Sequence, residues 1–336
     1  VTPGQVIDCA AVDFDRSSCR LMCDCAGEPA RRASHAFNLA SRSSVFCTEK
    51  SGGDLRATPP GNRSRTGLAR CCSAGVVLSR SMCGRFVSAS SPGDIADYFG
   101  ATTMSETLTE PNFNVAPSMN IPVIVSNDDG RHLDLMRWGL IPFWAKSASI
   151  GNKMINARVE TVTEKSTFRN AAKKHRCIIP ADAFYEWTAV SDPAAKKPRK
   201  QPWCIQRADG APFAFAGLFE TWRDPDGDGS RLRSCTILTG PANAAIEPIH
   251  DRMPIMVAPA LWDAWLDPAD ADASGLLERI ETPPTELFQI HAVSTAVNNS
   301  RSSGSQLMDE VESMTEQSLT ALADQAVTDD AQETLL

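Results

Sequence analysis

"IPVIVSNDDGRHLDLMRWGL", residues 121–140, sets the fold class of this chain of 336 residues. Its first half is an apolar run that ends in Asn-Asp-Asp-Gly, and its second half alternates between apolar and polar residues. An apolar run, a turn signal and an alternating run are together typical of a β-hairpin. We therefore predict two antiparallel strands here, joined by a tight turn.

Further short strands are predicted outward from this hairpin, at residues 176–187, 203–210, 212–222, 234–240 and 253–259. Three helices are expected, at residues 92–100, 161–174 and 259–267, and "SPGD" before the first of them is a typical helix start. Residues 191–202, "SDPAAKKPRKQP", are expected to form a loop rich in proline and lysine. Many short strands with a few helices predict an α+β domain built on an antiparallel sheet.

The composition divides the chain into three parts. Residues 1–81 hold seven of the eleven cysteines and show no lasting helical or strand periodicity, so we expect an extension that is disordered or not native to the protein. The alternative for this part is a zinc site at Cys19, Cys23, Cys25 and Cys47, but the spacing C-x3-C-x-C matches no common zinc signature, and no metal is expected. Residues 82–301 are expected to form one domain. Residues 302–336 are expected to be an acidic, poorly ordered tail with at most one helix, near 306–325.

The charge is unevenly distributed. The net charge is −8, but residues 1–81 carry +4 (11 basic, 7 acidic) and residues 302–336 carry −8 (eight acidic, no Lys or Arg). This balance argues against a generally basic, DNA-coating protein but allows a locally basic groove. No apolar run is long enough to span a membrane and no signal peptide is evident, so we expect a cytoplasmic protein.

The segment "SMCGRF" (81–86) resembles a translation start. If Met82 began the chain and were removed, Cys83 would carry a free α-amine beside its thiol. Both groups titrate near neutral pH, with pKa values of about 8 and about 8.5. Such a 1,2-aminothiol condenses with an aldehyde to a five-membered thiazolidine ring. The alternative is an ordinary buried cysteine at the start of a strand.

Three further residues are candidates for chemistry. Asn156 shares a strand face with Arg158 in "MINARVETV", a pair suited to a sugar oxygen and a phosphate, although an ordinary exposed face is the alternative. Glu186 lies among aromatics in "FYEW", where desolvation would raise its pKa and suit it to proton transfer. His250 precedes an apolar strand beside Asp251 and is a candidate acid or base. The alternative for Glu186 is a glutamate on the solvated face of a strand, and the alternative for His250 is a histidine that only forms part of a turn.

Two aromatic or polar segments are candidates for contact with nucleic acid. "NFNVAPS" (112–118) presents Asn114 and Pro117, and "RWGLIPFWAK" (137–146) places Phe143 and Trp144 between basic residues. Aromatic side chains flanked by cations can stack on unpaired bases while the cations hold phosphates. Trp138 is instead expected to lie in the core.

In order along the chain, "MCGRF", "NFNVAP", "RWGLIPFWAK", "NARVET", "RCIIPADAFYEW", "IHDRMPIMV" and "HAVSTAVNN" resemble the successive motifs of the SRAP family, the SOS-response-associated peptidase-like or abasic site processing proteins. The resemblance covers residues 82–301. It implies a single α+β domain with a curved, barrel-like antiparallel sheet and flanking helices. It also implies binding of single-stranded DNA, covalent crosslinking to abasic sites, and no metal or organic cofactor.

The resemblance also implies roles for individual residues. The catalytic set would be Cys83 as nucleophile, Asn156 positioning the sugar, Glu186 shuttling protons and His250 assisting ring opening as acid or base. The DNA-binding set would be Arg85 and Arg158 on phosphates, Asn114 ordering the pocket, and Pro117, Phe143 and Trp144 separating and stacking the neighbouring bases.

One feature departs from the family pattern, because the cysteine should be the first residue and here it is residue 83. Three explanations are open: a start placed too far upstream, a propeptide removed before Cys83, or a protein that has lost the crosslinking reaction. Two other functions also remain open. One is a cysteine peptidase using Cys83, and the other is a non-catalytic single-strand-binding module. The expected partner is single-stranded DNA with abasic sites, and the expected state is a monomer.

Overall fold

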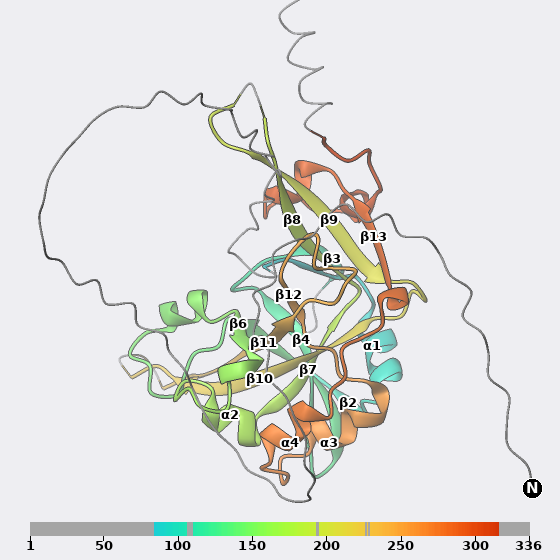
Figure 1. The fold of residues 1–336 in the computed structure, drawn as a ribbon. Helices are drawn as coiled ribbons and strands as arrows, with labels where there is room; N and C mark the ends of the chain where they lie inside the picture. Colours follow the sequence, from blue (N-terminus) through green and yellow to red (C-terminus); the bar gives the residue numbers. More distant parts are fainter. Residues whose placement is uncertain (1–83, 106–109, 193–194, 226, 228, 316–336) are drawn as a thin grey trace, which may run out of the picture. The chain divides into compact units, whose positions relative to one another are not determined.

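The structure is a computed structural model that describes residues 84–105, 110–192, 195–225, 227 and 229–315 (Figure 1). These residues belong to one compact unit, Arg70–Leu336. The expected extension at 1–81, the nucleophile candidate Cys83, and residues 316–336 lie outside the described residues.

The strands form two sheets. The larger sheet runs in the order β12 (Arg252–Pro254), β11 (Arg231–Pro241), β10 (Phe213–Arg223), β7 (Arg176–Ala181), β4 (Asn120–Asn127), β5 (Gly130–Trp138) and β2 (Thr103–Met104), with β6 (Asn156–Arg158) paired to β11. The smaller sheet runs in the order β13 (Phe288–Ala292), β9 (Arg199–Arg207), β8 (Ala183–Val190), β1 (Phe86–Ser88) and β3 (Asn112–Val115).

Five strands of the larger sheet close into a barrel. The predicted hairpin is confirmed, since β4 and β5 pair antiparallel from Asn120↔Arg137 to Asn127↔Gly130. β5 also pairs with β11, at Ser234↔Arg137, so that β4, β5, β11, β10 and β7 form a closed ring. The expected α+β class with a barrel-like sheet is confirmed. The sheet was expected to be antiparallel, but β5 and β11 pair in parallel. This pairing joins two segments that are far apart in the sequence.

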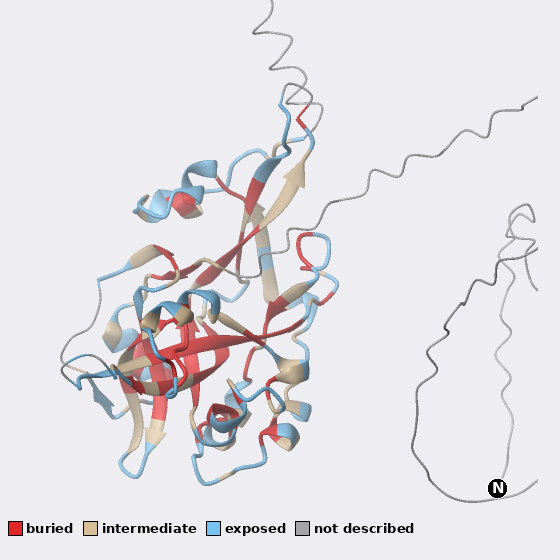
Figure 2. Cartoon of the chain, turned by 90° about the vertical axis from the view of Figure 1, so that its left-hand side faces the viewer, coloured by how far each residue is buried: buried red, intermediate tan, exposed pale blue. Residues whose placement is uncertain are grey.

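Strand alternation gives the barrel an inner and an outer apolar face. Ile179, Phe215 and Ile237 belong to one buried cluster, which fills the barrel. Their neighbours Ile178 and Ala216 belong to a second cluster, which also contains apolar residues of the helices. Figure 2 shows the buried residues concentrated on these strands. Residues of opposite parity on one strand thus face two different cores, as period-two alternation requires.

The first predicted helix is confirmed as α1 (Pro92–Phe99). The Ser91 side chain caps it by accepting from the Asp94 backbone N–H, Pro92 is its first residue, and Gly100 ends it at φ 65°. The helix predicted at 161–174 was too long, because the α-helix there, α2, covers only Arg169–Lys174. The helix predicted at 259–267 is confirmed as the 3₁₀ turn Pro259–Leu261 followed directly by α3 (Trp262–Leu266). The helix α4 (Ala273–Glu278) was not predicted.

Residues 176–187 form two strands, and the prediction of one was wrong. The break is at Asp182, where the chain leaves the barrel for the smaller sheet. One carboxylate oxygen of Asp182 accepts from the backbone N–H of Ala89 (2.6 Å) and of Ser90 (2.9 Å). The carboxylate therefore stabilises the crossing by satisfying two backbone donors of the neighbouring segment.

Three other boundaries differ from the prediction. The loop expected at 191–202 is shorter, because β9 begins at Arg199 and pairs with Val190 of β8. The strand expected at 253–259 pairs continuously only over Arg252–Pro254. Short strands went unpredicted where a run of two to five residues carries too little periodicity: β1, β2, β3 and β13.

Residues 302–315 are anchored in the fold, although they belong to the segment expected to be poorly ordered. Ser305–Met308 forms a 3₁₀ turn, in which Leu307 is buried, and Glu310 forms a β-bridge to Val293. Within the described residues, every helix is too short or too polar to span a bilayer.

Candidate functional site

Glu186 lies on β8 and only 1% of its surface is exposed. β8 pairs antiparallel with β1 at Phe86↔Phe184, and the Tyr185 backbone N–H donates to the Arg85 carbonyl (3.1 Å). Continued by one residue, this register brings Gly84 opposite Glu186. Gly84 is the residue next to Cys83 in the sequence, so the buried carboxyl group lies opposite the residue that follows the nucleophile candidate.

Three cysteines lie within the described residues, and all are buried: Cys177, Cys204 and Cys235. Burial raises the pKa of all three thiols, that of Cys204 to about 12. A buried, protonated thiol is a poor nucleophile. These three cysteines therefore pack the core, and none of them competes with Cys83 for a catalytic role.

Asn156 and Arg158 lie on β6, as the strand prediction for "MINARVETV" requires. β6 pairs in parallel with β11 at Ile237↔Asn156 and Thr239↔Arg158. Between them Ala157 is 1% exposed, whereas Arg158 is exposed. Alternation along the strand therefore directs Asn156 and Arg158 to the face opposite Ala157, where an amide and a guanidinium lie on the same side of the strand.

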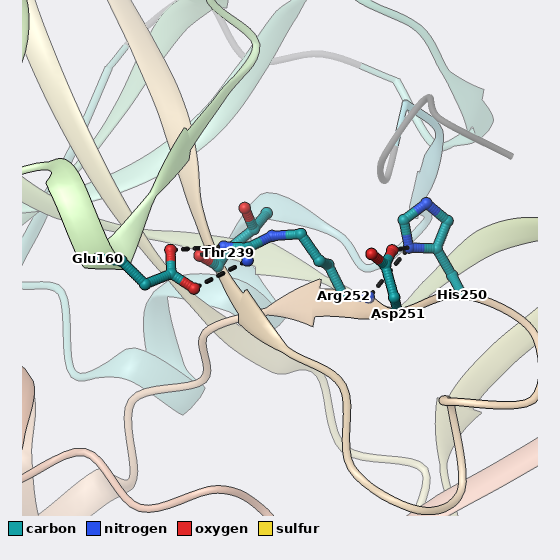
Figure 3. Close-up of polar contacts among 5 residues, drawn as sticks. All are labelled: Glu160, Thr239, His250, Asp251 and Arg252. Atoms are coloured by element: carbon teal, nitrogen blue, oxygen red, sulfur yellow. Dashed lines mark hydrogen bonds and ion pairs between the residues drawn. The ribbon is translucent and has the colours of Figure 1, made fainter. Parts of the chain in front are cut away.

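His250 ends the turn before β12, and 1% of its surface is exposed. Its Nδ1 accepts a hydrogen bond from the Arg252 backbone N–H (3.0 Å) and also lies 3.0 Å from Oδ1 of Asp251 (Figure 3). Its Nε2 is buried and has no hydrogen-bond partner among the described residues. In Figure 3 this nitrogen points away from both neighbours, so it is the ring atom that Asp251 and Arg252 leave unengaged.

Arg85 and Asn114 form a brace of hydrogen bonds, which fits the expected role of Asn114 in ordering the pocket. Asn114 is 1% exposed; its Oδ1 accepts from Arg85 Nη1 (2.7 Å), and its Nδ2 donates to the carbonyls of Asn299 (3.0 Å) and Ser302 (3.1 Å). Its amide is thus saturated and cannot be reached from solvent. Arg85 also donates to the Val297 carbonyl (2.8 Å), and burial lowers the pKa of its guanidinium.

The loop after β5 presents two exposed aromatic side chains, with Phe143 60% and Trp144 51% exposed. Two adjacent aromatic side chains, both more than half exposed, form an apolar patch, and exposed apolar patches are typical of binding surfaces. The loop is anchored at Ala145, whose carbonyl accepts from Trp222 Nε1 (2.7 Å). A cavity of about 470 Å³ lies beside Trp144 and is lined in part by Lys146 and Lys153. Lys153 was not predicted, although it is only nine residues from Trp144.

Pro117 is half-buried in a turn that contacts this aromatic loop. Asn152 Oδ1 accepts from Ser118 Oγ (2.8 Å) and from Arg137 Nη2 (2.8 Å), which ties the Pro117 turn to the loop. Arg137 is thus engaged in holding the loop. Trp138 is confirmed as a core residue, fully buried and bonded to the Ile155 carbonyl.

The predicted residues fall into two clusters over one apolar core. Arg85, Asn114 and Glu186 belong to the smaller sheet or contact it, whereas Asn156, Arg158 and His250 flank β11 in the larger one. The core cluster that contains Phe86 and Phe184 also contains Ile237 and Met253, so it underlies both groups. Among the described residues, no group of three or more His, Cys, Asp or Glu side chains is placed to hold a metal ion.

Comparison with known families identifies this arrangement. The profile of the SOS response associated peptidase (SRAP) family matches residues 82–300. The chain belongs to this family.

Several curated proteins are similar to the chain. The abasic site processing protein YoqW of Bacillus subtilis is 40% identical over 229 residues, which cover 68% of this chain and 99% of that protein. The abasic site processing protein YedK of Escherichia coli is 30% identical over 241 residues, which cover 68% of this chain and 100% of that protein. The abasic site processing protein HMCES of Xenopus tropicalis is 34% identical over 227 residues, which cover 59% of this chain and 66% of that protein.

Solved structures show the same fold. A crystal structure of a Bacteroides thetaiotaomicron protein superposes with a TM-score of 0.59 at 23% identity, covering 68% of this chain and all of that one. A crystal structure of a Bordetella bronchiseptica protein has a TM-score of 0.51 at 27% identity, covering 63% and all of that chain.

Proposed function

We propose that this protein binds single-stranded DNA and forms a covalent crosslink at abasic sites through Cys83, once Cys83 is the N-terminal residue. The names of the curated relatives support the substrate. The observation that carries the mechanism is the register of β1 and β8, which brings Gly84 opposite the buried Glu186. Glu186, the candidate proton-transfer group, thus faces Gly84, which follows in the sequence the residue that would present both an amine and a thiol.

The proposed reaction balances without an oxidant or a reductant. The amine nitrogen of Cys83 attacks C1′ of the ring-opened deoxyribose aldehyde, and loss of one water leaves an imine. The thiolate then attacks the imine carbon, the C–S bond forms, and the nitrogen takes a proton. The product is a thiazolidine and one water. Glu186 would move the protons, because a carboxyl group shielded from solvent is suited to that role.

The residues around β11 would hold and open the sugar. Asn156 and Arg158 share one face of β6, which suits a sugar oxygen and the adjacent phosphate. His250 would act at the sugar ring through Nε2, which has no hydrogen-bond partner among the described residues. Ring opening breaks the C1′–O4′ bond, so that O4′ gains a proton while the C1′ hydroxyl loses one.

The aromatic loop would bind the flanking bases. Phe143 and Trp144 expose planar faces on an anchored loop, and Pro117 lies in the turn tied to that loop. Stacking on exposed aromatics is tolerant of sequence, which suits a lesion that can occur anywhere. Arg85 would hold a phosphate with the part of its guanidinium that the brace leaves available.

The domain boundaries follow from this proposal. Residues 82–301 would carry the reaction, with residues 302–315 packed against them and the remaining acidic residues outside the catalytic fold. Residues 1–81 would have no catalytic role, because a chain that keeps them has no α-amine at Cys83. Initiation at Met82 and removal of a leader before Cys83 would both give the active form.

The test compares two forms of the chain, one beginning at Val1 and one at Met82, each with an abasic single-stranded oligonucleotide. Intact mass spectrometry identifies the N-terminus, and a denaturing gel reports the crosslink. We expect a heat-stable band only where Cys83 is N-terminal, and none with Cys83→Ala. A band from Cys83→Ala, or none from a verified N-terminal Cys83, would refute the proposal. Cleavage of an added peptide without crosslinking would instead support the peptidase function.

A further inference from the structure

Glu160 and Arg252 join two parts of the site that are distant in sequence (Figure 3). The Arg252 guanidinium binds Glu160 through Nη1–Oε1 (2.8 Å) and Nη2–Oε2 (2.9 Å), and Nη2 also donates to the Thr239 carbonyl (2.6 Å). Thr239 lies on β11, between β6 on one side and β12 on the other. The ion pair therefore spans β11 and fixes the start of β12, where Arg252 lies, to the end of β6.

The backbone of Arg252 in turn sets the state of His250. Two neighbours lie 3.0 Å from Nδ1, and they require opposite protonation states. The Arg252 N–H can donate only to an unprotonated Nδ1, whereas the Asp251 carboxylate attracts an Nδ1 that carries a proton.

The backbone donor is the stronger constraint. His250 and the main chain of β12 are held in place, and an N–H buried without an acceptor costs about 1–3 kcal/mol. The Asp251 side chain is 65% exposed, so water can solvate its carboxylate in other rotamers. The neutral ring therefore carries its proton on Nε2.

We propose that Glu160 and Arg252 are a positioning pair, which holds the Arg252 N–H on Nδ1 and so fixes His250 as the Nε2–H tautomer. His250 then presents a hydrogen-bond donor to the site and no lone pair at that atom. This distinguishes the two roles open for His250, since a donor can stabilise the sugar ring oxygen as it leaves C1′, whereas a base cannot. A neutral imidazole can act as such an electrophilic donor.

The target of this donor rests on the proposed function, but the tautomer does not, so the two are tested separately. The tautomer is measured on the DNA-free protein with ring-¹⁵N-labelled histidine. The chain has five histidines, and His250→Gln identifies the signal of His250. We expect Nδ1 to resonate as the unprotonated nitrogen and Nε2 as the protonated one. The reverse pattern, or a fully charged ring near neutral pH, would overturn the inference whatever the protein does with DNA.

The pair is tested with Glu160→Gln, which removes the charge but keeps the shape. We expect the Nδ1–H tautomer to become populated and the crosslinking rate at saturating abasic DNA to fall about tenfold, because general acid–base groups contribute 10²- to 10⁴-fold and here only one is misplaced. The DNA concentration at half-saturation should not rise. Glu160→Asp, which keeps the charge, should restore part of the rate.

The control is Asp263→Asn, which removes the partner of Arg131 in another ion pair that joins distant segments (2.6 Å). It should change neither the tautomer nor the rate. If Glu160→Gln matches this control in both measurements, the pair does not position His250. If the tautomer shifts but the rate is unchanged, the pair positions His250 but the donor role is wrong. If no form of the protein crosslinks, the proposed function fails while the tautomer result stands.

Discussion

Gly139 and Gly151 approach so closely that a Cβ on Gly139 would lie 2.5 Å from the Gly151 carbonyl oxygen. Gly139 follows β5, and Gly151 lies in the 3₁₀ turn Ala148–Lys153. The contact between these two backbones brings together the two ends of the loop that carries Phe143 and Trp144. The position of the exposed aromatics therefore depends on two residues that have no side chain.

We expect Gly139→Ala to destabilise the fold by about 3 kcal/mol or more. Its φ of +119° is strained for any L-residue, which costs about 1–3 kcal/mol, and no side-chain rotation relieves the overlap with backbone atoms. Gly210→Ala is the control, because Gly210 also has a positive φ, +73°, but nothing lies within 4 Å of its added Cβ. Urea unfolding measures both, and equal losses would contradict a role for the close approach.

Replacing Phe143 and Trp144 by alanine should weaken binding of single-stranded DNA without destabilising the protein. Stacking of one base on an aromatic contributes about 1–3 kcal/mol, so the double variant should bind at least tenfold more weakly. Its unfolding free energy should change little, since both side chains are more than half exposed. Fluorescence anisotropy with an undamaged oligonucleotide measures affinity. Met104→Ala, at a residue 51% exposed on β2, is the control and should bind normally.

Asn114→Ala should destabilise the fold by about 2–3 kcal/mol. The variant leaves the carbonyls of Asn299 and Ser302 and the guanidinium of Arg85 without the amide that joins them. Asn120→Ala, at an exposed asparagine at the start of β4, should change stability by less than about 0.5 kcal/mol. Urea unfolding distinguishes the two, and a neutral Asn114→Ala would show that the brace adds nothing to stability.

The Glu160–Arg252 pair should make part of the stability dependent on pH. The hydrogen bond from Arg252 lowers the pKa of the Glu160 carboxyl below its ordinary value. A lowered folded-state pKa stabilises the protein above the unfolded-state pKa, and this contribution is lost as pH falls through the folded-state value. Glu160→Gln should therefore be less stable than the native chain at pH 7, and this difference should shrink below about pH 4. A difference that stays constant with pH would contradict the assignment.

Local signals predicted the elements whose stabilising contacts are themselves local. The helix α1 was found because Ser91, Pro92 and Gly100 supply its cap, its first turn and its stop within ten residues. The hairpin of β4 and β5 was found because its turn lies between two patterned runs. The break at Asp182 was missed because its cause is the pair of N–H groups of Ala89 and Ser90, which are 93 and 92 residues away.

In the candidate site, too, local sequence predicted some features, and contacts between distant residues decided the others. The order of the motifs identified Glu186, Asn156 and His250 as candidates, since each residue type and its immediate neighbours suggest a chemistry. The same motifs gave no indication that Asn114 is buried and saturated by the carbonyls of residues 299 and 302. Nor did they distinguish between acid and base for His250.

By itself, the sequence determined the α+β class, the central hairpin, the family and the types of reactive group, because these depend on patterns within short segments. Only the tertiary structure decided that β5 meets β11 in parallel to close the barrel, and that Glu160 reaches Arg252 across 92 residues. The physical reason is that hydrogen bonds and ion pairs act over a few ångströms in space. The chain brings these partners together only when the elements that carry them pack against one another.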